Sequence, residues 1–171
     1  EAIEVSEQAK LPVEPIRLII SAIDLDAPIV KAKQEEIVLK SGTFDQWSAP
    51  DEFAVGWQFD NAILGIKGNT VLNGHHNVHG KVFENLNKLV SGDRILVEGN
   101  DGNFYHYTVT NVMILPERDV KIEQRLENAR WILPSADERI TLITCWPYFS
   151  NTHRLIVVAK PDRTIQRELI Q

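Results

Sequence analysis

The sequence predicts a mostly-β domain whose strands close, or nearly close, into a barrel. Short runs rich in β-branched and aromatic residues recur along the chain and are separated by turn residues at regular spacing, which is typical of all-β folds. Helical periodicity is limited to two short segments, so helices do not alternate with strands as a layered parallel α/β sheet requires. We expect about seven strands or slightly more, and one or two short helices.

The predicted strands follow one another along the whole chain. In the first half they cover residues 16–23, 28–32, 37–39 and 70–75. In the second half they cover residues 94–98, 104–115, 139–144 and 154–160. The turn Asn100-Asp101-Gly102-Asn103 predicts a hairpin. The last two runs are rich in Val, Ile, Leu and Thr, which predicts buried strands joined by a short loop.

Two segments have helical spacing. In residues 80–89 the apolar positions form one stripe, made of Val82, Phe83, Leu86 and Leu89. This spacing predicts an amphipathic helix that ends before Ser91-Gly92-Asp93. A second, shorter helix is predicted around residues 122–129, within a mainly polar stretch.

Length and composition indicate one globular domain. The chain has 171 residues, of which 43% are hydrophobic, and its net charge of −6 argues against nucleic-acid and anionic-membrane binding. Its one cysteine excludes an internal disulfide, and no run reaches the ~20 apolar residues of a membrane span. We expect residues 1–14 to be a linker that follows a removed N-terminal segment, residues 15–160 to be the folded domain, and residues 161–171 to be a peripheral tail.

The cysteine, Cys145, is the first candidate for a reactive group. It ends an apolar run and precedes Trp146-Pro147, and a strand end that opens into a loop can both fix and expose a side chain. Arg154 begins the next strand, so an antiparallel hairpin would bring it close to Cys145. A guanidinium beside the sulfur favours the thiolate and can hold an oxyanion. The alternatives are a buried structural cysteine and an arginine that extends to solvent.

Two adjacent histidines, His75 and His76, follow Asn73-Gly74 at the end of another predicted strand. A neutral imidazole near the thiol can accept its proton and return it. Strand alternation puts the two rings on opposite faces, so only one can share a cleft with Cys145 unless the strand bends. The alternative is that both are solvated loop residues. A metal site of His75, His76 and His79 is not favoured, because the spacing matches no common zinc pattern and no acidic residue lies among them.

These residues resemble the sortase family. Thr141-Leu142-Ile143-Thr144-Cys145 resembles its Thr-Leu-x-Thr-Cys strand, which an essential Arg follows, here Arg154. Asn73-Gly74-His75 resembles its Gly-His block, and Gly56-Trp57 and Pro15-Ile16-Arg17-Leu18 are also similar to family elements. The main blocks occur in the family's order, and the resemblance runs from about residue 15 to residue 160.

The resemblance implies an eight-stranded β-barrel and the activity of a cysteine transpeptidase. It implies that Cys145 is the nucleophile, that His75 is the general acid and base, and that Arg154 positions substrate and stabilises the oxyanion. Thr144, beside the nucleophile, is implied to help orient Arg154 or the bound peptide. The predicted substrate-binding residues are Thr144, Trp146 and His76.

The implied reaction is acyl transfer. A peptide resembling Leu-Pro-x-Thr-Gly is cleaved between Thr and Gly through a thioester, and the acyl group passes to an amine of the cell wall or of a pilin. No organic cofactor is implied. Some relatives bind calcium, and Glu117, Asp119 and Glu123 lie in the corresponding loop, although a solvated acidic face is the favoured alternative. The implied location is the extracellular face of a bacterial membrane, with the anchor outside this chain.

The sortase class stays open. The loop after Cys145 is most similar to that of pilin-assembling sortases, which usually carry an N-terminal lid, and residues 1–10 show no lid motif. An L,D-transpeptidase would place its cysteine in a Ser-His-Gly-Cys block, and a papain-like protease would place its histidine after the cysteine. The non-enzymatic alternative is a catalytically silent sortase-like barrel that binds a peptide.

Overall fold

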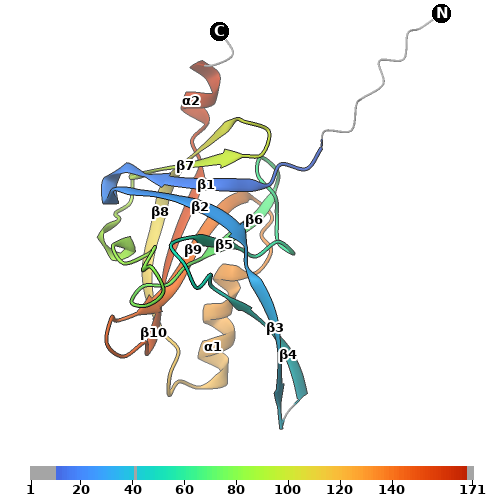
Figure 1. The fold of residues 1–171 in the computed structure, drawn as a ribbon, viewed down its shortest axis with the longest axis vertical. Coiled ribbons are helices and arrows are strands. Elements are labelled where there is room, and N and C mark those ends of the chain that lie inside the picture. The colour runs from blue at the N-terminus through green and yellow to red at the C-terminus, as the bar shows by residue number, and fades with distance from the viewer. Residues whose placement is uncertain (1–10, 41, 169–171) are drawn as a thin grey trace, which may run out of the picture.

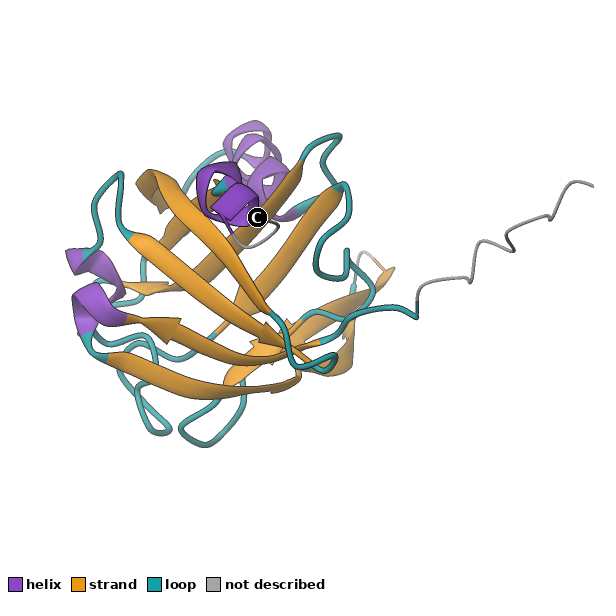
Figure 2. Cartoon of the chain, turned by 90° about the horizontal axis from the view of Figure 1, so that it is seen from above, coloured by secondary structure: helices purple, strands orange, loops and turns teal. Residues whose placement is uncertain are grey.

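The computed structural model describes residues 11–40 and 42–168. Eight strands form a closed barrel in the order β1-β2-β5-β6-β9-β10-β8-β7, and Figure 2 shows them wrapped around the interior. The barrel strands are β1 (Pro15–Ile20), β2 (Leu25–Lys31), β5 (Val55–Trp57), β6 (Gly68–Asn73), β7 (Arg94–Gly99), β8 (Phe104–Pro116), β9 (Glu138–Trp146) and β10 (His153–Pro161). The predicted eight-stranded barrel is confirmed.

The barrel is mainly antiparallel but contains two parallel pairs. β8, β10 and β9 form the longest ladder, with β10 in the middle (Figure 1). The pairs β2–β5 and β6–β9 are parallel, and each needs a long crossover connection. The sequence did not reveal these pairs, because crossover connections carry no local turn signal.

The core fills the inside of the barrel. Alternate residues of each strand point inward, so one face of every strand supplies apolar side chains. Completely buried members include Leu18, Ile20, Leu72, Leu142 and Val157. The centre of β10, from Leu155 to Ala159, is buried on both faces. This two-sided burial explains why its sequence is continuously apolar instead of alternating.

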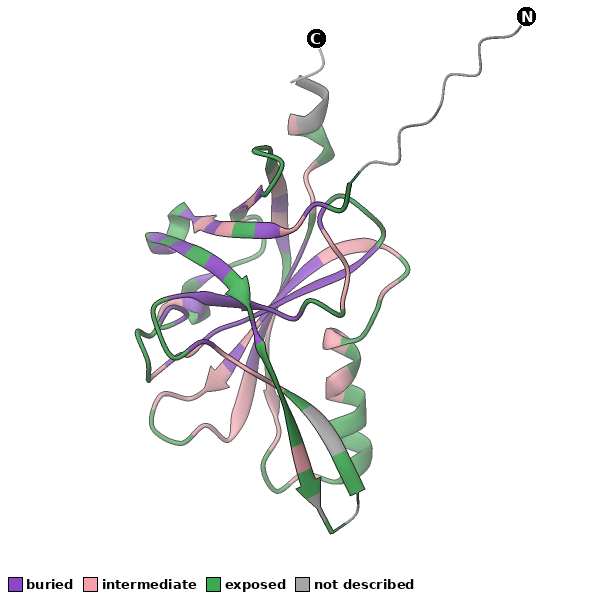
Figure 3. Ribbon diagram, turned by 45° about the vertical axis from the view of Figure 1, so that its right-hand side comes forward, coloured by how far each residue is buried: buried purple, intermediate pink, exposed green. Residues whose placement is uncertain are grey.

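A second, two-stranded sheet extends away from the barrel (Figure 1). It consists of β3 (Lys33–Leu39) and β4 (Gly42–Ser48), paired antiparallel. The sequence predicted only residues 37–39 here and missed β4 and the short barrel strand β5. Figure 3 shows that much of this hairpin is exposed. A strand with solvent on both faces has no hydrophobic alternation to detect.

The predicted helix over residues 80–89 is wrong. The segment consists of turns and a short 3₁₀-helix, η2 (Leu86–Lys88). Gly80 and Lys81 both have positive φ, and the Phe83 amide bonds to the His75 carbonyl instead of continuing a helical ladder. The apolar stripe is nevertheless buried, so the pattern predicted burial correctly and conformation incorrectly.

The predicted helix around residues 122–129 is confirmed as α1 (Ile122–Ala129). The other helical elements are short: η1 (Ser21–Ile23), η3 (Arg130–Ile132) and α2 (Arg163–Glu168). The predicted strand 16–23 therefore ends earlier, at Ile20, where η1 begins. None of the helices within residues 11–40 and 42–168 is both long enough and apolar enough to cross a membrane.

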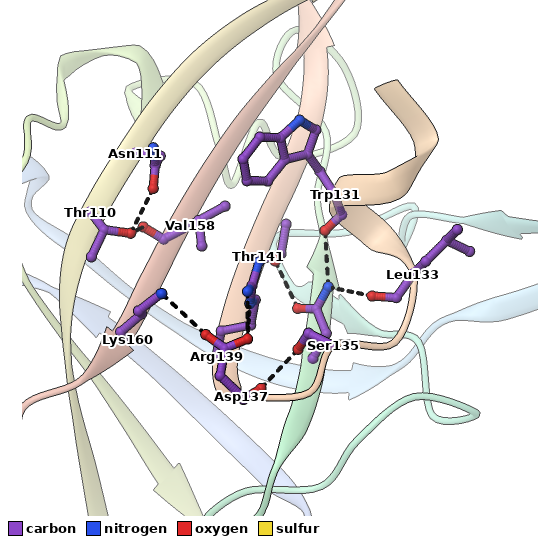
Figure 4. Close-up of polar contacts among 11 residues, drawn as sticks. Thr110, Asn111, Trp131, Leu133, Ser135, Asp137, Arg139, Thr141, Val158 and Lys160 are labelled. Atoms are coloured by element: carbon purple, nitrogen blue, oxygen red, sulfur yellow. Dashed lines mark hydrogen bonds and ion pairs between the residues drawn. The ribbon is translucent and has the colours of Figure 1, made fainter. Parts of the chain in front are cut away.

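The connection from α1 back to β9 is held to the barrel by side-chain hydrogen bonds (Figure 4). The Asn69 amide on β6 donates to the carbonyls of Trp131, at 2.9 Å, and Leu133, at 3.0 Å. Its oxygen accepts a 2.7 Å bond from Thr141 on β9. Asn69 is buried, so each bond replaces water that the amide lost on folding. This network keeps α1 beside the outer face of the barrel.

Candidate active site

Cys145 and Arg154 face each other across neighbouring strands. Cys145 is the second-last residue of β9, Arg154 is the second residue of β10, and the antiparallel register pairs them directly. Directly opposed residues point to the same side of a sheet. Arg154 Nη1 therefore lies 3.3 Å from Cys145 Sγ. The predicted proximity of these two side chains is confirmed.

Glu117, just after β8, contacts the Nε and Nη2 atoms of the Arg154 guanidinium, away from Cys145. Arg154 Nη2 donates a 3.2 Å hydrogen bond to Glu117 Oε1. Arg154 Nε lies 2.7 Å from Glu117 Oε2, an ion-pair distance whose angles do not make a second hydrogen bond. The carboxylate engages two nitrogens of the planar group and leaves Nη1 directed at the thiol. The sequence favoured a solvated acidic residue at Glu117 over a calcium ligand and did not predict its pairing with Arg154.

The other two acidic residues of the loop, Asp119 and Glu123, are exposed, in line with the favoured interpretation of a solvated acidic face. Among the described residues, the three carboxylates do not gather into a three-ligand cluster. The structure thus assigns Glu117 an arginine partner, and calcium binding in this loop stays the untested, less favoured alternative.

His75 lies just beyond the end of β6, on the other side of Cys145. The parallel pairing of β6 with β9 extends past Asn73, because the Gly74 amide bonds to the Ile143 carbonyl at 3.3 Å. The buried Thr144 hydroxyl donates a 2.7 Å bond to the Gly74 carbonyl. This extended register brings His75 level with Cys145. Thr144 thus links β9, which carries Cys145, to the segment that carries His75 through a side-chain hydrogen bond.

The environment of His75 favours a neutral imidazole. Burial is the main cause that lowers the pKa of His75, and the nearby His79 lowers it further. Asp51 and the Ala49 backbone oppose this shift. The Nε2 atom of His75 is buried and has no hydrogen-bond partner in the described part of the chain. A neutral imidazole is the form that can accept a proton.

His76 is more deeply buried than His75 and contacts different parts of the chain. Its side chain is only 3% exposed, and its Nδ1 lies 3.2 Å from the Phe83 carbonyl. Its ring also lies 5.2 Å, between centroids, from that of Trp146. Trp146 is half-buried and packs against the barrel core. The substrate-binding roles of His76, Trp146 and Thr144 stay predictions, and the observed contacts of His76 and Thr144 are internal.

Gly74 packs closely against the side chains of Val82 and Phe83, which leave no room for a Cβ atom at this position. A Cβ atom there would lie 2.6 Å from Val82 Cγ1 and 2.7 Å from Phe83 Cδ2. Contacts this short force neighbouring atoms to move. The glycine therefore lets residues 82–83 pack beneath the segment that carries both histidines.

An apolar groove of about 510 Å³ leads to Arg154. It lies between α1 and the outer faces of β8, β9 and β10. Its apolar lining includes Leu115, Ile122, Leu126, Ile132, Ile143 and Ile156. Ile122 and Leu126 are 61% and 63% exposed, so the α1 face is open to a ligand. Sequence reasoning missed this groove, although the spacing of Ile122 and Leu126 marks an apolar face on α1.

Comparison with known proteins identifies the family. The family model described as "Sortase domain" matches residues 18–162. Sortase A of Listeria monocytogenes is 33% identical over 103 residues, which cover 60% of this chain and 41% of that protein. The chain spans 26% to 56% of the lengths of the curated relatives it matches.

Solved structures agree with the family model. The lid mutant of sortase A from Corynebacterium diphtheriae superposes with a TM-score of 0.66 at 24% identity, over 91% of this chain and 74% of that one. A complex of Streptococcus agalactiae sortase C1 with MTSET gives a TM-score of 0.62 at 26% identity, over 86% and 68% of the two chains. The residues matched by the family model, 18–162, include strands β2 to β10 together with His75, Cys145 and Arg154. The chain belongs to the sortase family.

Proposed function

We propose that this chain carries the catalytic domain of a cysteine transpeptidase that acts on sorting signals of surface proteins. The observation that supports this most is the 3.3 Å contact between Arg154 Nη1 and Cys145 Sγ. A structural cysteine needs no guanidinium beside it, whereas a nucleophile benefits from a donor that stabilises the thiolate and then the oxyanion.

The groove supplies a place for the peptide. In the proposal, the Leu-Pro part of a Leu-Pro-x-Thr-Gly-like signal lies on the apolar lining between α1 and the barrel. The Thr carbonyl then reaches Cys145, because Arg154 lines the same groove and contacts the sulfur. Apolar lining with a few polar groups at one end is the usual composition of a site that orients its ligand.

The chemical steps use the three side chains in turn. Neutral His75 takes the thiol proton as Cys145 Sγ attacks the carbonyl carbon of Thr, and Arg154 donates to the resulting oxyanion. Collapse of this intermediate breaks the C–N bond, and the leaving Gly amine takes the proton from His75. An acceptor amine then attacks the thioester, loses its proton to His75 and releases the thiolate, which recovers that proton. Two acyl-transfer steps thereby replace one difficult exchange.

The test is transpeptidation of a peptide library varied around Leu-Pro-x-Thr-Gly, in the presence of soluble amines, with products identified by mass. We expect cleavage after Thr and capture of the acyl group by the amine. Cys145→Ala should abolish both products while its circular dichroism matches the wild type. Activity of the Cys145→Ala variant at the wild-type level would contradict the assignment of the nucleophile.

The alternative is a catalytically silent barrel that binds a peptide in the same groove. Alkylation of Cys145 by iodoacetamide at neutral pH separates the two, because a cleft nucleophile reacts and a structural cysteine does not. Cys145 is half-buried and contacts a guanidinium, which favours the enzyme.

The cellular setting follows from the same proposal. The partners are sorting-signal peptides of surface proteins and an acceptor amine from peptidoglycan or a pilin. The domain would act at the outer face of the bacterial membrane. The same library experiment, repeated with a lysine side-chain amine and with a peptidoglycan stem-peptide amine, distinguishes pilus polymerisation from wall anchoring.

A further inference from the structure

Three potential metal ligands meet beside the proposed active site. Asp51, His75 and His79 each place one donor atom within 4.8 Å of the other two. His79 Nε2 lies 3.9 Å from Asp51 Oδ1, and the His75 and His79 ring centroids are 5.0 Å apart. Asp51 supplies the carboxylate that the sequence around the histidines lacks. It comes from the loop before β5, which the sequence places far from His75.

Packing between two loops brings the ligands together. Gly80 has a φ of +80°, and a Cβ there would lie 2.5 Å from the Phe53 amide nitrogen. The loop after His79 therefore rests directly on the backbone that follows Asp51. This tertiary contact brings Asp51 to the two histidines, because only His75 and His79 are close in the sequence.

Of the three candidate ligands, His75 has a buried donor atom, whereas the side chains of Asp51 and His79 are exposed and free to rotate. His75 Nε2 is buried without a hydrogen-bond partner in the described structure, although buried polar atoms are normally paired. The side chains of Asp51 and His79 are 70% and 51% exposed, so solution ions can reach them. Donors in a tetrahedral zinc site lie about 3.3 Å apart. Rotations of the two exposed side chains can bring the cluster to that spacing.

We propose that Asp51, His75 and His79 bind a divalent transition-metal ion of the zinc class and that the bound ion reversibly inhibits the domain. Two imidazoles and one carboxylate suit Zn²⁺, whereas Ca²⁺ prefers six or more oxygen ligands. The inhibition rests on the role proposed above for His75, because an imidazole nitrogen that binds a metal cannot carry the proton between thiol and amine.

The binding test must separate this site from the reactive thiol, since a thiolate also binds zinc. Equilibrium dialysis with Zn²⁺ is therefore carried out on Cys145→Ala and on the same variant combined with Asp51→Asn, His79→Gln or, as a matched control, His106→Gln on β8. We expect one Zn²⁺ per chain for Cys145→Ala and for the His106 control. Loss of Asp51 or His79 should weaken binding at least about tenfold, which altering a supporting residue alone can cause.

Two binding results would overturn the site. One is absence of Zn²⁺ binding by the Cys145→Ala protein, which would assign any wild-type binding to the thiol. The other is equal affinity of the Asp51, His79 and His106 variants. Ca²⁺ in place of Zn²⁺ should not bind to the cluster, and equal binding of the two ions would also overturn the proposed ligand class.

The functional test uses proteins that retain Cys145. Zn²⁺ should inhibit wild-type transpeptidation and chelation should restore it, while His79→Gln should need at least about tenfold more Zn²⁺ for the same fractional inhibition. Each variant is compared with its own metal-free rate. Equal zinc sensitivity of His79→Gln and the wild type would overturn the inhibitory role. If the metal-free protein has no activity, the proposed function fails, while dialysis still decides whether the metal site exists.

Discussion

The fold positions the two proposed partners of Cys145, Arg154 and His75, in different ways. On one side, Arg154 is positioned by nine register pairs between β10 and β8, interrupted by one irregularity at Val158/Ala159, and by seven consecutive pairs between β10 and β9. On the other side, His75 lies beyond the last β6–β9 register pair, where two hydrogen bonds of Gly74, from its amide to the Ile143 carbonyl and from the Thr144 hydroxyl to its carbonyl, continue the contact. A strand ladder is held by many backbone hydrogen bonds, which side-chain substitutions leave in place. A single side-chain hydrogen bond is lost when one residue is substituted. The histidine side should therefore be more sensitive to distant packing changes than the arginine side.

Direct removal of the imidazole tests the histidine side most strongly. His75→Ala should lower transpeptidation by about 10²–10⁴-fold, the usual contribution of a general acid and base. His76→Ala removes a ring that bonds to the Phe83 carbonyl and should act mainly on stability. Steady-state rates and melting curves of both variants are compared. An inactive His76→Ala beside an active His75→Ala would reverse the assignment of the two rings.

On the arginine side, Arg154→Lys keeps the charge and removes the planar fork. A lysine cannot contact Cys145 and both oxygens of Glu117 with the same geometry. We expect a loss of roughly 10²–10³-fold in kcat, comparable to that of one oxyanion donor, with little change in melting temperature because the ladder remains. A Lys variant within a few-fold of the wild-type rate would assign Arg154 a purely structural role.

Glu117→Gln tests how far Arg154 depends on its partner. The amide oxygen can still accept a hydrogen bond, but a neutral acceptor is weaker than a charged one by roughly 1 kcal/mol, or about fivefold to tenfold. As a positioning residue, Glu117 should affect kcat more than KM, and Glu117→Asp should recover part of the loss. An unchanged kcat together with a raised KM would instead assign Glu117 to peptide binding.

The smallest direct perturbation is a methyl group on the histidine side. Gly74→Ala should cost about 1–3 kcal/mol of unfolding free energy through overpacking against Val82 and Phe83. Gly92→Ala is a matched control, because its Cβ meets nothing within 4 Å and its cost, about 1–2 kcal/mol, comes from a left-handed backbone at φ +100°. Urea unfolding measures both costs. Only Gly74→Ala should also lose activity, and equal activity of the two variants would show that His75 tolerates movement of its segment.

The sequence predictions were accurate on the arginine side of Cys145 and less accurate on the histidine side. The hairpin of β9 and β10 was predictable because its apolar runs and short loop are local signals, and its register follows from antiparallel pairing. The helix predicted over residues 80–89 was wrong because Gly80 and Lys81 adopt positive φ and the Phe83 amide bonds to His75. Periodicity identified which residues are buried, but a stripe of four apolar residues is equally compatible with irregular turns packed on a barrel.

The sequence by itself determined the barrel and the identities of Cys145, His75 and Arg154 as candidates, because alternating apolar strands and short motifs depend on neighbouring residues. Only the tertiary structure decided that Glu117 pairs with Arg154, that Asn69 holds the α1–β9 connection, and that Asp51 lies beside His75 and His79. These contacts join residues from separate loops and strands. Their distances depend on how the barrel closes and, for Asp51, on Gly80, where the loop after His79 approaches the backbone of Phe53, which no local pattern encodes.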